Sequence, residues 1–293
     1  MSYHEIIARH SRSLAPQPTG EQPALTDIGP IRAVLFDVYG TLIISGSGDV
    51  GTAAEQGKEE ALTGALAACE LAPTAPIDGG YQRVIEVIGE HHSRAKASGV
   101  EYPEVDIVSV WNDVVDHLIS SGELNAPTHD FDLCQLAVEF EVRTNPVWPM
   151  PGMVECLQAI RAAGCPLGIV SNAQFFTLEI FPAVAKQDLA GLGFANDLQF
   201  YSYRYGQAKP GRFLYAEAVK ALSRRGIQPD EVLYVGNDLL NDIRPARELG
   251  FNAALFAGDA RSLRRREGDP RVEGIAPDLV VTDLMQIVDL FNR

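Results

Sequence analysis

The chain has 293 residues, and 46% of them are hydrophobic, so it can bury a sizeable core and its length alone suggests about two domains. The formal net charge is −15, which excludes proteins that bind nucleic acid through a basic face. An anionic small substrate remains compatible with this charge, because one lysine and a metal ion can make a pocket locally positive.

No apolar run reaches the roughly 18 residues that a transmembrane helix needs. The segment from Met1 to His10 lacks the apolar core of a secretory signal. The four cysteines are scattered without a CxxC pair, which argues against a zinc site or a disulfide framework. We therefore expect a cytoplasmic protein that binds neither membrane nor nucleic acid.

Residues 1–30 read as an N-terminal extension to which the sequence assigns no function. A short helix is expected from Tyr3 to Leu14, and the proline-rich stretch from Ala15 to Pro30 is typical of a linker. The apolar run from Ile31 to Phe36 then predicts a buried strand. This strand ends on Asp37, and such an ending aims a carboxylate at the ligand-binding edge of a parallel sheet.

The next segment changes character twice. Gly46 to Gly51 fits the pattern GxGxxG, but no second strand follows it, so we interpret it as a flexible connector and not as a dinucleotide site. Apolar residues then recur at helical spacing, with no convincing strand before Thr144. The expected helices cover 53–71, 79–97, 104–120 and 130–143.

From Asn145 a rigid linker, Pro146–Gly152, leads into alternating helices and strands. The expected strands cover 166–170, 198–203, 231–235, 252–256 and 279–281, and the expected helices cover 153–163, 212–223 and 284–291. This alternation predicts an α/β fold with a Rossmann-like parallel sheet. The core domain would comprise 31–45 and 146–293, and a helical cap domain, 46–145, would cover a cleft over Asp37.

Polar residues of different kinds follow these strands. They are Ser171 and Asn172, Lys209, and the acids Asp238 and Asp242. Each is ordinary by itself, because Ser-Asn is a common helix entry and an acidic turn is common at any surface. All of them would converge on the sheet edge that carries Asp37, which favours one shared site.

With these motifs, the chain resembles the haloacid dehalogenase (HAD) superfamily of hydrolases with a helical cap inserted after the first strand. The matching motifs are DVYGTL at 37–42, SN at 171–172, KP at 209–210 and GNDLLND at 236–242. The resemblance implies that Asp37 is the nucleophile and that Lys209 neutralises the acidic cluster. It also implies that Thr41 and Ser171 position the nucleophile and the substrate, with Ser171 and Asn172 as the predicted substrate-binding residues.

The resemblance further implies Mg²⁺, for which Asp37, Tyr39, Asp238 and Asp242 are the predicted ligand positions, with a backbone carbonyl and a substrate oxygen. A carboxylate can attack phosphorus to give an aspartyl-phosphate. Its approach to an anionic phosphoryl group requires nearby positive charge, which a lysine and a divalent metal supply.

Two positions depart from the family's phosphatase pattern. Tyr39 replaces an aspartate that acts as general acid and base, and dehalogenases of the family also carry tyrosine there. Asn237 replaces an acid, and Asp238 beside it is expected to take over the ligand role with Asp242. The tyrosine of the first motif favours a dehalogenase, whereas the two acids of the fourth motif favour a metal and a phosphate.

Three hypotheses follow. The first is a Mg²⁺-dependent phosphatase that acts on a small phosphorylated metabolite. The second is a 2-haloacid dehalogenase that works through an alkyl-aspartyl ester, for which Arg83 and Arg94 are the candidates for binding the substrate carboxylate. The third is a binding or regulatory protein with little turnover. Neither the substrate nor the oligomeric state follows from the sequence.

Overall fold

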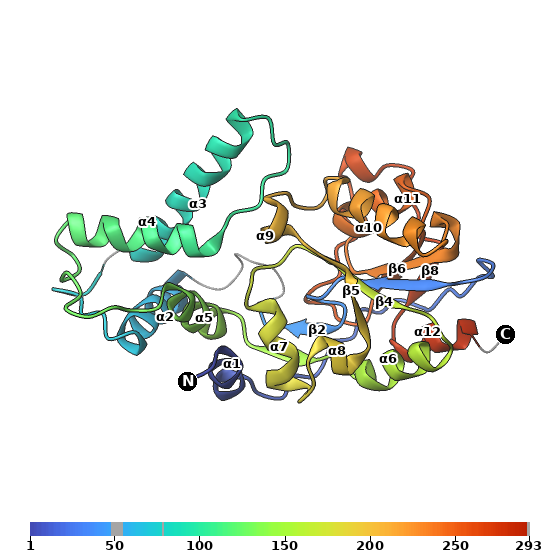
Figure 1. Ribbon diagram of the computed structural model, residues 1–293, viewed down its shortest axis with the longest axis horizontal. Helices are drawn as coiled ribbons and strands as arrows, with labels where there is room; N and C mark the ends of the chain where they lie inside the picture. Colours follow the sequence, from blue (N-terminus) through green and yellow to red (C-terminus); the bar gives the residue numbers. More distant parts are fainter. Residues whose placement is uncertain (48–54, 78, 292–293) are drawn as a thin grey trace.

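The computed structural model describes residues 1–47, 55–77 and 79–291 (Figure 1). A six-stranded parallel sheet forms its centre, with the strand order β5-β4-β1-β6-β7-β8. The strands are β1 (Ala33–Phe36), β4 (Leu167–Ser171), β5 (Phe194–Tyr201), β6 (Val232–Gly236), β7 (Asn252–Phe256) and β8 (Leu279–Val281). The predicted Rossmann-like α/β core is confirmed, and β5 begins four residues earlier than expected.

Helices cover both faces of the sheet, and β1 is buried between them. Ala33 and Leu35 pack into the apolar cluster under one layer of helices, and Val34 and Phe36 pack into the cluster under the other. The first layer consists of α10 (Phe213–Arg224) and α11 (Arg244–Glu248). The second layer consists of α6 (Met153–Ala162), α7 (Thr177–Val184), α8 (Leu189–Leu192) and α12 (Met285–Val288). A strand with both faces buried must be continuously apolar, which explains the run that predicts β1.

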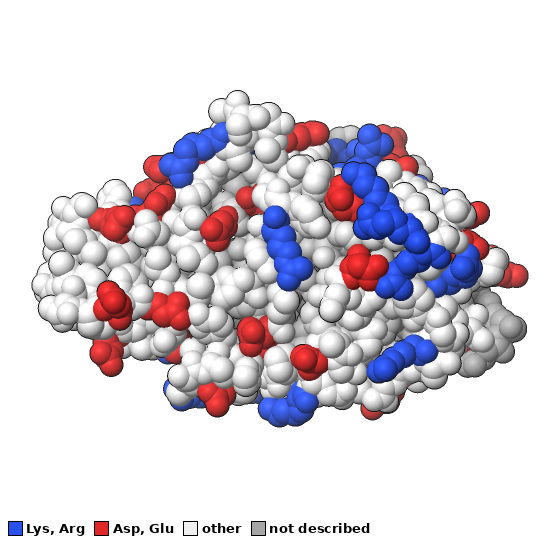
Figure 2. All heavy atoms as spheres, viewed as in Figure 1, with Lys and Arg blue, Asp and Glu red and all other residues white. Residues whose placement is uncertain are grey.

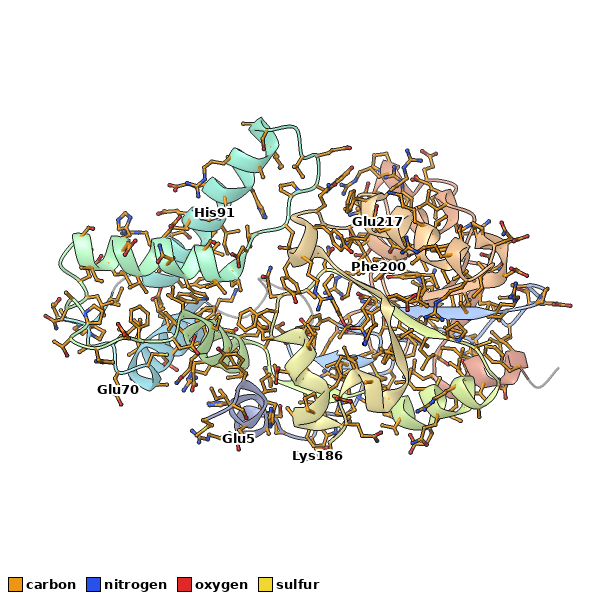
Figure 3. All side chains as sticks on the ribbon, in the orientation of Figure 1. Glu5, Glu70, His91, Lys186, Phe200 and Glu217 are labelled. Atoms are coloured by element: carbon orange, nitrogen blue, oxygen red, sulfur yellow. The ribbon has the colours of Figure 1, made fainter. Side chains whose placement is uncertain are left out.

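Four helices between β2 (Ile43–Ser45) and β3 (Val147–Pro149) form what we call the helical cap. They are α2 (Glu55–Ala68), α3 (Gly80–Ala97), α4 (Ile107–Ser120) and α5 (Leu133–Thr144). They enclose an apolar cluster of their own, which includes Trp111 and Leu136. His91 on α3, labelled in Figure 3, bonds Asp113 on α4 at 2.9 Å, so it stabilises the cap and is not simply a surface residue.

The two chain segments that join the cap to the sheet are paired with each other. β2 and β3 form an antiparallel ribbon, in which Ile44 lies opposite Trp148. Asn145, at the end of α5, accepts a hydrogen bond from Ser45 Oγ at 2.8 Å. The sequence predicts only a rigid linker here, because strands this short show too little alternation to be recognised.

The N-terminal extension also differs from the predicted linker. Its helix α1 (Tyr3–His10) ends before the expected Leu14, and it buries Ile6 and Ile7 between α5 of the cap and α7 of the core. Further along, Ala24 pairs antiparallel with Val280 through two backbone hydrogen bonds of 2.9 and 3.0 Å. The extension therefore begins between the cap and the core and then runs along the core.

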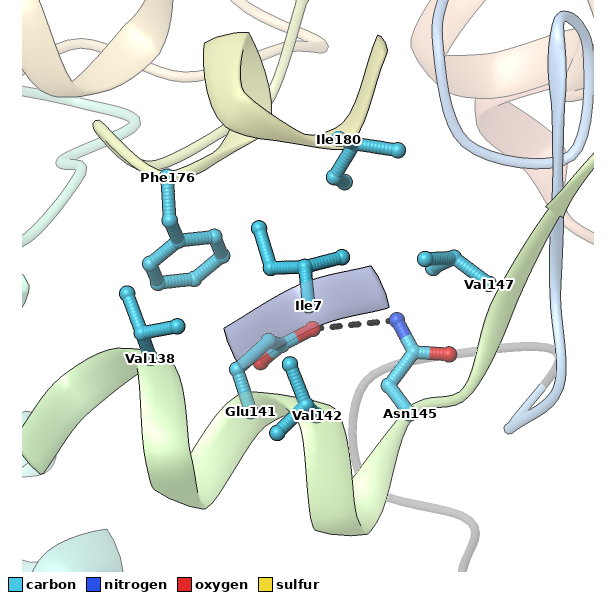
Figure 4. A pocket seen from close by; sticks show the side chains of 8 residues that line it. All are labelled: Ile7, Val138, Glu141, Val142, Asn145, Val147, Phe176 and Ile180. Carbon is cyan, nitrogen blue, oxygen red and sulfur yellow. Dashed lines mark hydrogen bonds between the residues drawn. The ribbon is translucent and has the colours of Figure 1, made fainter. Parts of the chain in front are cut away.

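A small cavity of about 10 Å³ lies where α1, α5 and α7 meet (Figure 4). Glu141 is the acidic residue in its lining, and Asn145 donates a hydrogen bond of 3.0 Å to it. The other lining side chains are apolar, and Ile7 and Phe176 are among them. Burial accordingly raises the pKa of Glu141. The space accommodates about one water molecule and is too small for a substrate.

Charge is unevenly spread over the face seen in Figure 2. Lys and Arg side chains gather over α10 and α11, whereas acidic residues are scattered. Arg212 and Arg244 both form ion pairs with Glu248, which offsets part of this positive charge. Among the described helices, none is long and apolar enough to cross a membrane.

Candidate active site

Three charged residues predicted from separate motifs meet at the carboxyl edge of the sheet. Lys209 Nζ donates to Asp37 Oδ1 at 2.8 Å and to Asp242 Oδ1 at 2.6 Å. The side chains are 3%, 10% and 1% exposed, respectively, so water screens these charges little. The lysine is thus shared by two buried carboxylates.

The backbone around Asp37 fixes where its carboxylate lies. Its N–H donates to Val235 O of β6 at 2.9 Å, so the pairing with β6 continues one residue beyond β1. The chain then turns through Gly40, where φ is +79°. A Cβ at Gly40 would lie 2.4 Å from Ser262 Cβ, so both the turn and the close approach require glycine here.

Electrostatics favours a charged lysine at this site. Burial alone would lower the pKa of Lys209, but Asp242 and Asp37 outweigh it and raise the pKa to about 12. Burial raises the pKa of Asp242 to about 7, and Asp37 and Asp238 add to this rise while Lys209 opposes it. When Asp242 is ionised, the cluster carries one net negative charge that is poorly solvated.

Asp242 reaches the cluster from a π-helix, Leu239–Ile243, that follows β6. Asp242 Oδ2 accepts the backbone N–H of Asp238 at 3.0 Å. Its carboxylate packs directly on Gly236, where a Cβ would lie 2.4 Å from Asp242 Cγ. A side chain at Gly236 would displace this carboxylate, so the glycine of the fourth motif makes room for Asp242.

Asp238 is held differently. Its Oδ1 accepts the N–H groups of Leu240 at 2.8 Å and Asn241 at 3.2 Å, which caps the π-helix. Arg266 bonds both of its oxygens, with Nε 3.1 Å from Oδ1 and the second contact at 2.5 Å. This predicted metal ligand therefore forms its ion pair with Arg266 and not with Lys209.

Asn237 and Thr41 form a second contact at the edge of the site. Thr41 Oγ1 donates to Asn237 Oδ1 at 3.2 Å, and Asn237 Nδ2 donates to Ser262 O at 2.6 Å. Both ends of the amide are therefore engaged. Thr41, which the resemblance assigns to positioning, here holds the residue that replaces the family's acid.

Tyr39 is half-buried, and its hydroxyl lies 2.9 Å from Thr177 Oγ1 at the start of α7. Burial raises the pKa of Tyr39 well above that of a free phenol, and Glu141 and Asp37 add to the rise. Tyr39 is therefore neutral at pH 7. It can donate a hydrogen bond but cannot serve as a base.

Ser171 and Asn172 follow β4, the neighbour of β1. Ser171 is fully buried, and its hydroxyl makes a long contact of 3.4 Å with Asn172 O. Asn172 Oδ1 accepts the backbone N–H of Lys209 at 2.7 Å, and its Nδ2 donates to Lys209 O at 3.1 Å. Asn172 thus fixes the backbone that carries the lysine.

The predicted Mg²⁺ ligands therefore fall into two groups. Asp37 and Asp242 lie together, whereas Asp238 bonds Arg266 and the phenol of Tyr39 bonds Thr177. Among the described residues, no group of three or more His, Cys, Asp or Glu side chains is placed to hold a metal. Mg²⁺ commonly takes one or two carboxylates and adds water and substrate oxygens, so the donor pair Asp37 and Asp242 fits this ion.

Sequence reasoning missed two residues that contact the acids of the fourth motif. Tyr234 Oη on β6 lies 3.0 Å from Asp242 Oδ1 and 2.9 Å from Val170 O. A tyrosine in a buried strand is predicted to be an ordinary core residue, so the sequence does not indicate that its hydroxyl contacts an acid. Arg266 belongs to a basic run that is typical of a solvated loop, and only the fold brings it to Asp238.

The two arginines suggested for binding a substrate carboxylate have other partners. Arg83 pairs with Glu86 at 3.8 Å within α3. Arg94 pairs with Asp113 of α4 at 3.5 Å and is 62% exposed. The structure therefore brings neither of them to Asp37.

Comparison with known proteins agrees with this architecture. The family model of haloacid dehalogenase-like hydrolases matches residues 31–250, and the chain therefore belongs to that family of hydrolases. Glyceraldehyde 3-phosphate phosphatase of Methanopyrus kandleri is 24% identical over 266 residues, which cover 90% of this chain and 98% of the relative.

An uncharacterized hydrolase of Schizosaccharomyces pombe is 40% identical over 91 residues, which span 30% of this chain and only 37% of that relative. The crystal structure of a 2-haloacid dehalogenase from Pseudomonas syringae aligns with a TM-score of 0.56 at 20% identity, and the match covers 90% of this chain and 99% of that one. This likeness shows the shared fold.

Proposed function

We propose that this protein hydrolyses a small phosphate monoester with Asp37 as the nucleophile. The observation that carries the proposal is the Asp37 carboxylate at the end of the central strand, 2.8 Å from Lys209 Nζ. A carboxylate can act as a nucleophile, and a neighbouring cation lowers its repulsion from an anionic phosphoryl group. The phosphatase of Methanopyrus kandleri, which matches almost the whole chain, supports a phosphate monoester as substrate.

In the proposed reaction, a carboxylate oxygen of Asp37 attacks phosphorus. The bond from phosphorus to the ester oxygen breaks, and that oxygen takes a proton from solvent as the alcohol leaves; the water that attacks in the next step returns one proton to solvent. Water then attacks the phosphorus of the aspartyl-phosphate, which releases inorganic phosphate and restores the Asp37 carboxylate. Lys209 lowers the repulsion between the two anions, and Ser171 is proposed to contact the phosphoryl group.

Phosphatases of this family generally use Mg²⁺, and we propose Mg²⁺ as the cofactor here. Asp37 and Asp242 would hold the ion, and Asp238 would join them only after separating from Arg266. When bound, the ion supplies positive charge to the phosphoryl oxygens.

An aryl phosphate tests this proposal, because its leaving group departs without strong acid catalysis. Wild-type protein should release phosphate faster with Mg²⁺ than without it, and Asp37→Asn should abolish release. Asp197→Asn, which alters a surface acid paired with Arg225, is the matched control and should keep full activity. Full activity in Asp37→Asn would overturn the proposal.

Tyr39 favours a second candidate, hydrolysis of a 2-haloacid. Here Asp37 attacks the carbon that bears the halogen, and the halide leaves without needing a proton. Water then attacks the carboxyl carbon of the ester. In ¹⁸O-labelled water, a single turnover would therefore label Asp37, whereas the phosphatase route would label the released phosphate. Halide release with label in Asp37 would favour the second candidate.

We propose an anionic small molecule as the partner and the helical cap as a separate domain that selects it. A cytoplasmic location is proposed from the composition, and the four free cysteines are compatible with it. Ligand-induced thermal stabilisation without turnover of either substrate class would favour a binding role instead.

A further inference from the structure

The connection between α3 and α4 leaves the cap and reaches the core (Figure 1). Its Pro103 pairs antiparallel with Gln207, two residues before Lys209. Ala208 N–H donates to Tyr102 O at 2.8 Å. On the other side of this bridge, Glu104 N–H donates to Gly206 O at 3.1 Å. A cap segment thus pairs with the stretch of core that carries the active-site lysine.

Glu104 adds its side chain to this contact. Its carboxylate accepts hydrogen bonds from Ser202 Oγ at 2.6 Å, from Gln174 Nε2 at 3.2 Å and from its neighbour Val105 N–H at 2.9 Å. No ion pair is recorded for Glu104 within the described residues. A desolvated carboxylate needs such donors, and the hydrogen bonds it accepts are strong ones.

Both core partners of Glu104 involve the loop after β4: Gln174 belongs to this loop, and Ser202 bonds it. Ser202 Oγ accepts the N–H of Ala173 at 2.9 Å. Gln174 donates to Val105 O at 2.9 Å and accepts from Ile107 N–H at 3.2 Å. Gln174 is therefore bonded to the cap connection directly, and Ala173 is linked to it through Ser202.

The loop in turn fixes Lys209, because the Asn172 amide bonds both the N–H and the C=O of that residue. A continuous set of contacts thus runs from Glu104 through Ser202 and Ala173 to Asn172 and Lys209. We propose that Glu104 is a positioning residue whose docking holds residues 171–174 and 206–209 so that Lys209 meets Asp37.

This inference rests on the proposed function for its kinetic part only. With Glu104 docked, the site is assembled, and when the cap connection leaves the core, the loop and the lysine segment lose their fixed geometry. Misplacement by about 1 Å can cost on the order of a hundredfold in rate. Cap docking and the assembly of the catalytic site are therefore coupled through the Glu104 carboxylate and the backbone hydrogen bonds beside it.

The test compares Glu104→Ala, Ser202→Ala and their double variant with wild type. Glu101→Ala, an exposed carboxylate three residues away in the same connection, is the matched control. Amide hydrogen exchange over 171–174 and 206–209 is measured first, since it needs no turnover. Kinetics with the aryl phosphate, or with the haloacid if only that is turned over, follow.

Glu104→Ala should speed exchange in both segments, leave α10 and α11 unchanged and lower kcat by about tenfold or more with little change in KM. Ser202→Ala should do the same, and the double variant should lose no more than either single one. If Glu104→Ala does not fold, Ser202→Ala carries the test. Unchanged exchange in these segments would overturn the inference, and the exchange result stands even if wild type turns over neither substrate.

Discussion

Replacement of Lys209 by methionine is the sharpest test of the buried charge cluster. The substitution keeps most of the length of the side chain and removes its charge. Without the lysine, the carboxylates of Asp37 and Asp242 repel each other with no cation between them. Both side chains are at most 10% exposed, so water screens this repulsion little. Removing one partner of a buried ion pair typically costs about 3–5 kcal/mol, and here one lysine serves two carboxylates.

The cost should depend on pH. A carboxyl whose pKa is raised on folding binds a proton that the unfolded chain releases, so it lowers stability as pH rises towards the folded pKa. Asp242 already has a pKa of about 7 beside Lys209, and loss of the lysine raises it further. The variant should therefore lose more free energy of unfolding at pH 8 than at pH 5, where Asp242 is protonated.

Urea unfolding at both pH values measures this difference. We expect a loss of about 3 kcal/mol at pH 8, equivalent to about 5 °C in Tm for a chain of this size, and a smaller loss at pH 5. Lys220→Met, whose side chain is 64% exposed beside Glu217, should show no measurable loss. An equal loss of stability at the two pH values would show that Lys209→Met does not leave an ionisable Asp242 carboxylate buried without a cation, and it would refute this reasoning.

Three further changes test other contacts. Tyr234→Phe removes the hydroxyl beside Asp242 and should cost about 1 kcal/mol in urea unfolding, and no loss would contradict that bond. Ile7→Ala should cost about 3 kcal/mol because Ile7 is 2% exposed, whereas Ile85→Ala, at 41% exposure, should cost little, and equal losses would contradict the packing of α1. Arg266→Ala should tighten Mg²⁺ binding in calorimetry because it frees Asp238, and unchanged affinity would exclude that acid as a ligand.

The convergence of Asp37, Lys209 and Asp242 could be predicted because it follows from a general property of parallel sheets. The carboxyl ends of parallel strands lie at one edge of the sheet, so the residues that follow them meet there, even when they are up to 205 positions apart in the chain. The continuous apolar runs likewise predicted β7 and β8 at their observed limits. These features depend on local pattern and on topology, and both are written in the sequence.

Contacts that depend on the path of a loop could not be predicted. The basic run that contains Arg266 carries no apolar periodicity, so its approach to Asp238 depends on how the segment after β7 folds back. The same holds for Glu104, an acid in a cap connection without any motif. The helix of the N-terminal extension could be predicted, but its packing could not, because two buried isoleucines, Ile6 and Ile7, do not indicate which helices they contact.

The most direct test of the central claim is mass spectrometry of the trapped covalent intermediate. The protein is mixed with the aryl phosphate, quenched in acid within a turnover and digested. The account predicts one phosphoryl group on the peptide that contains Asp37, and none in Asp37→Asn. Turnover in wild type without any adduct at Asp37, or with the adduct on another residue, would contradict it.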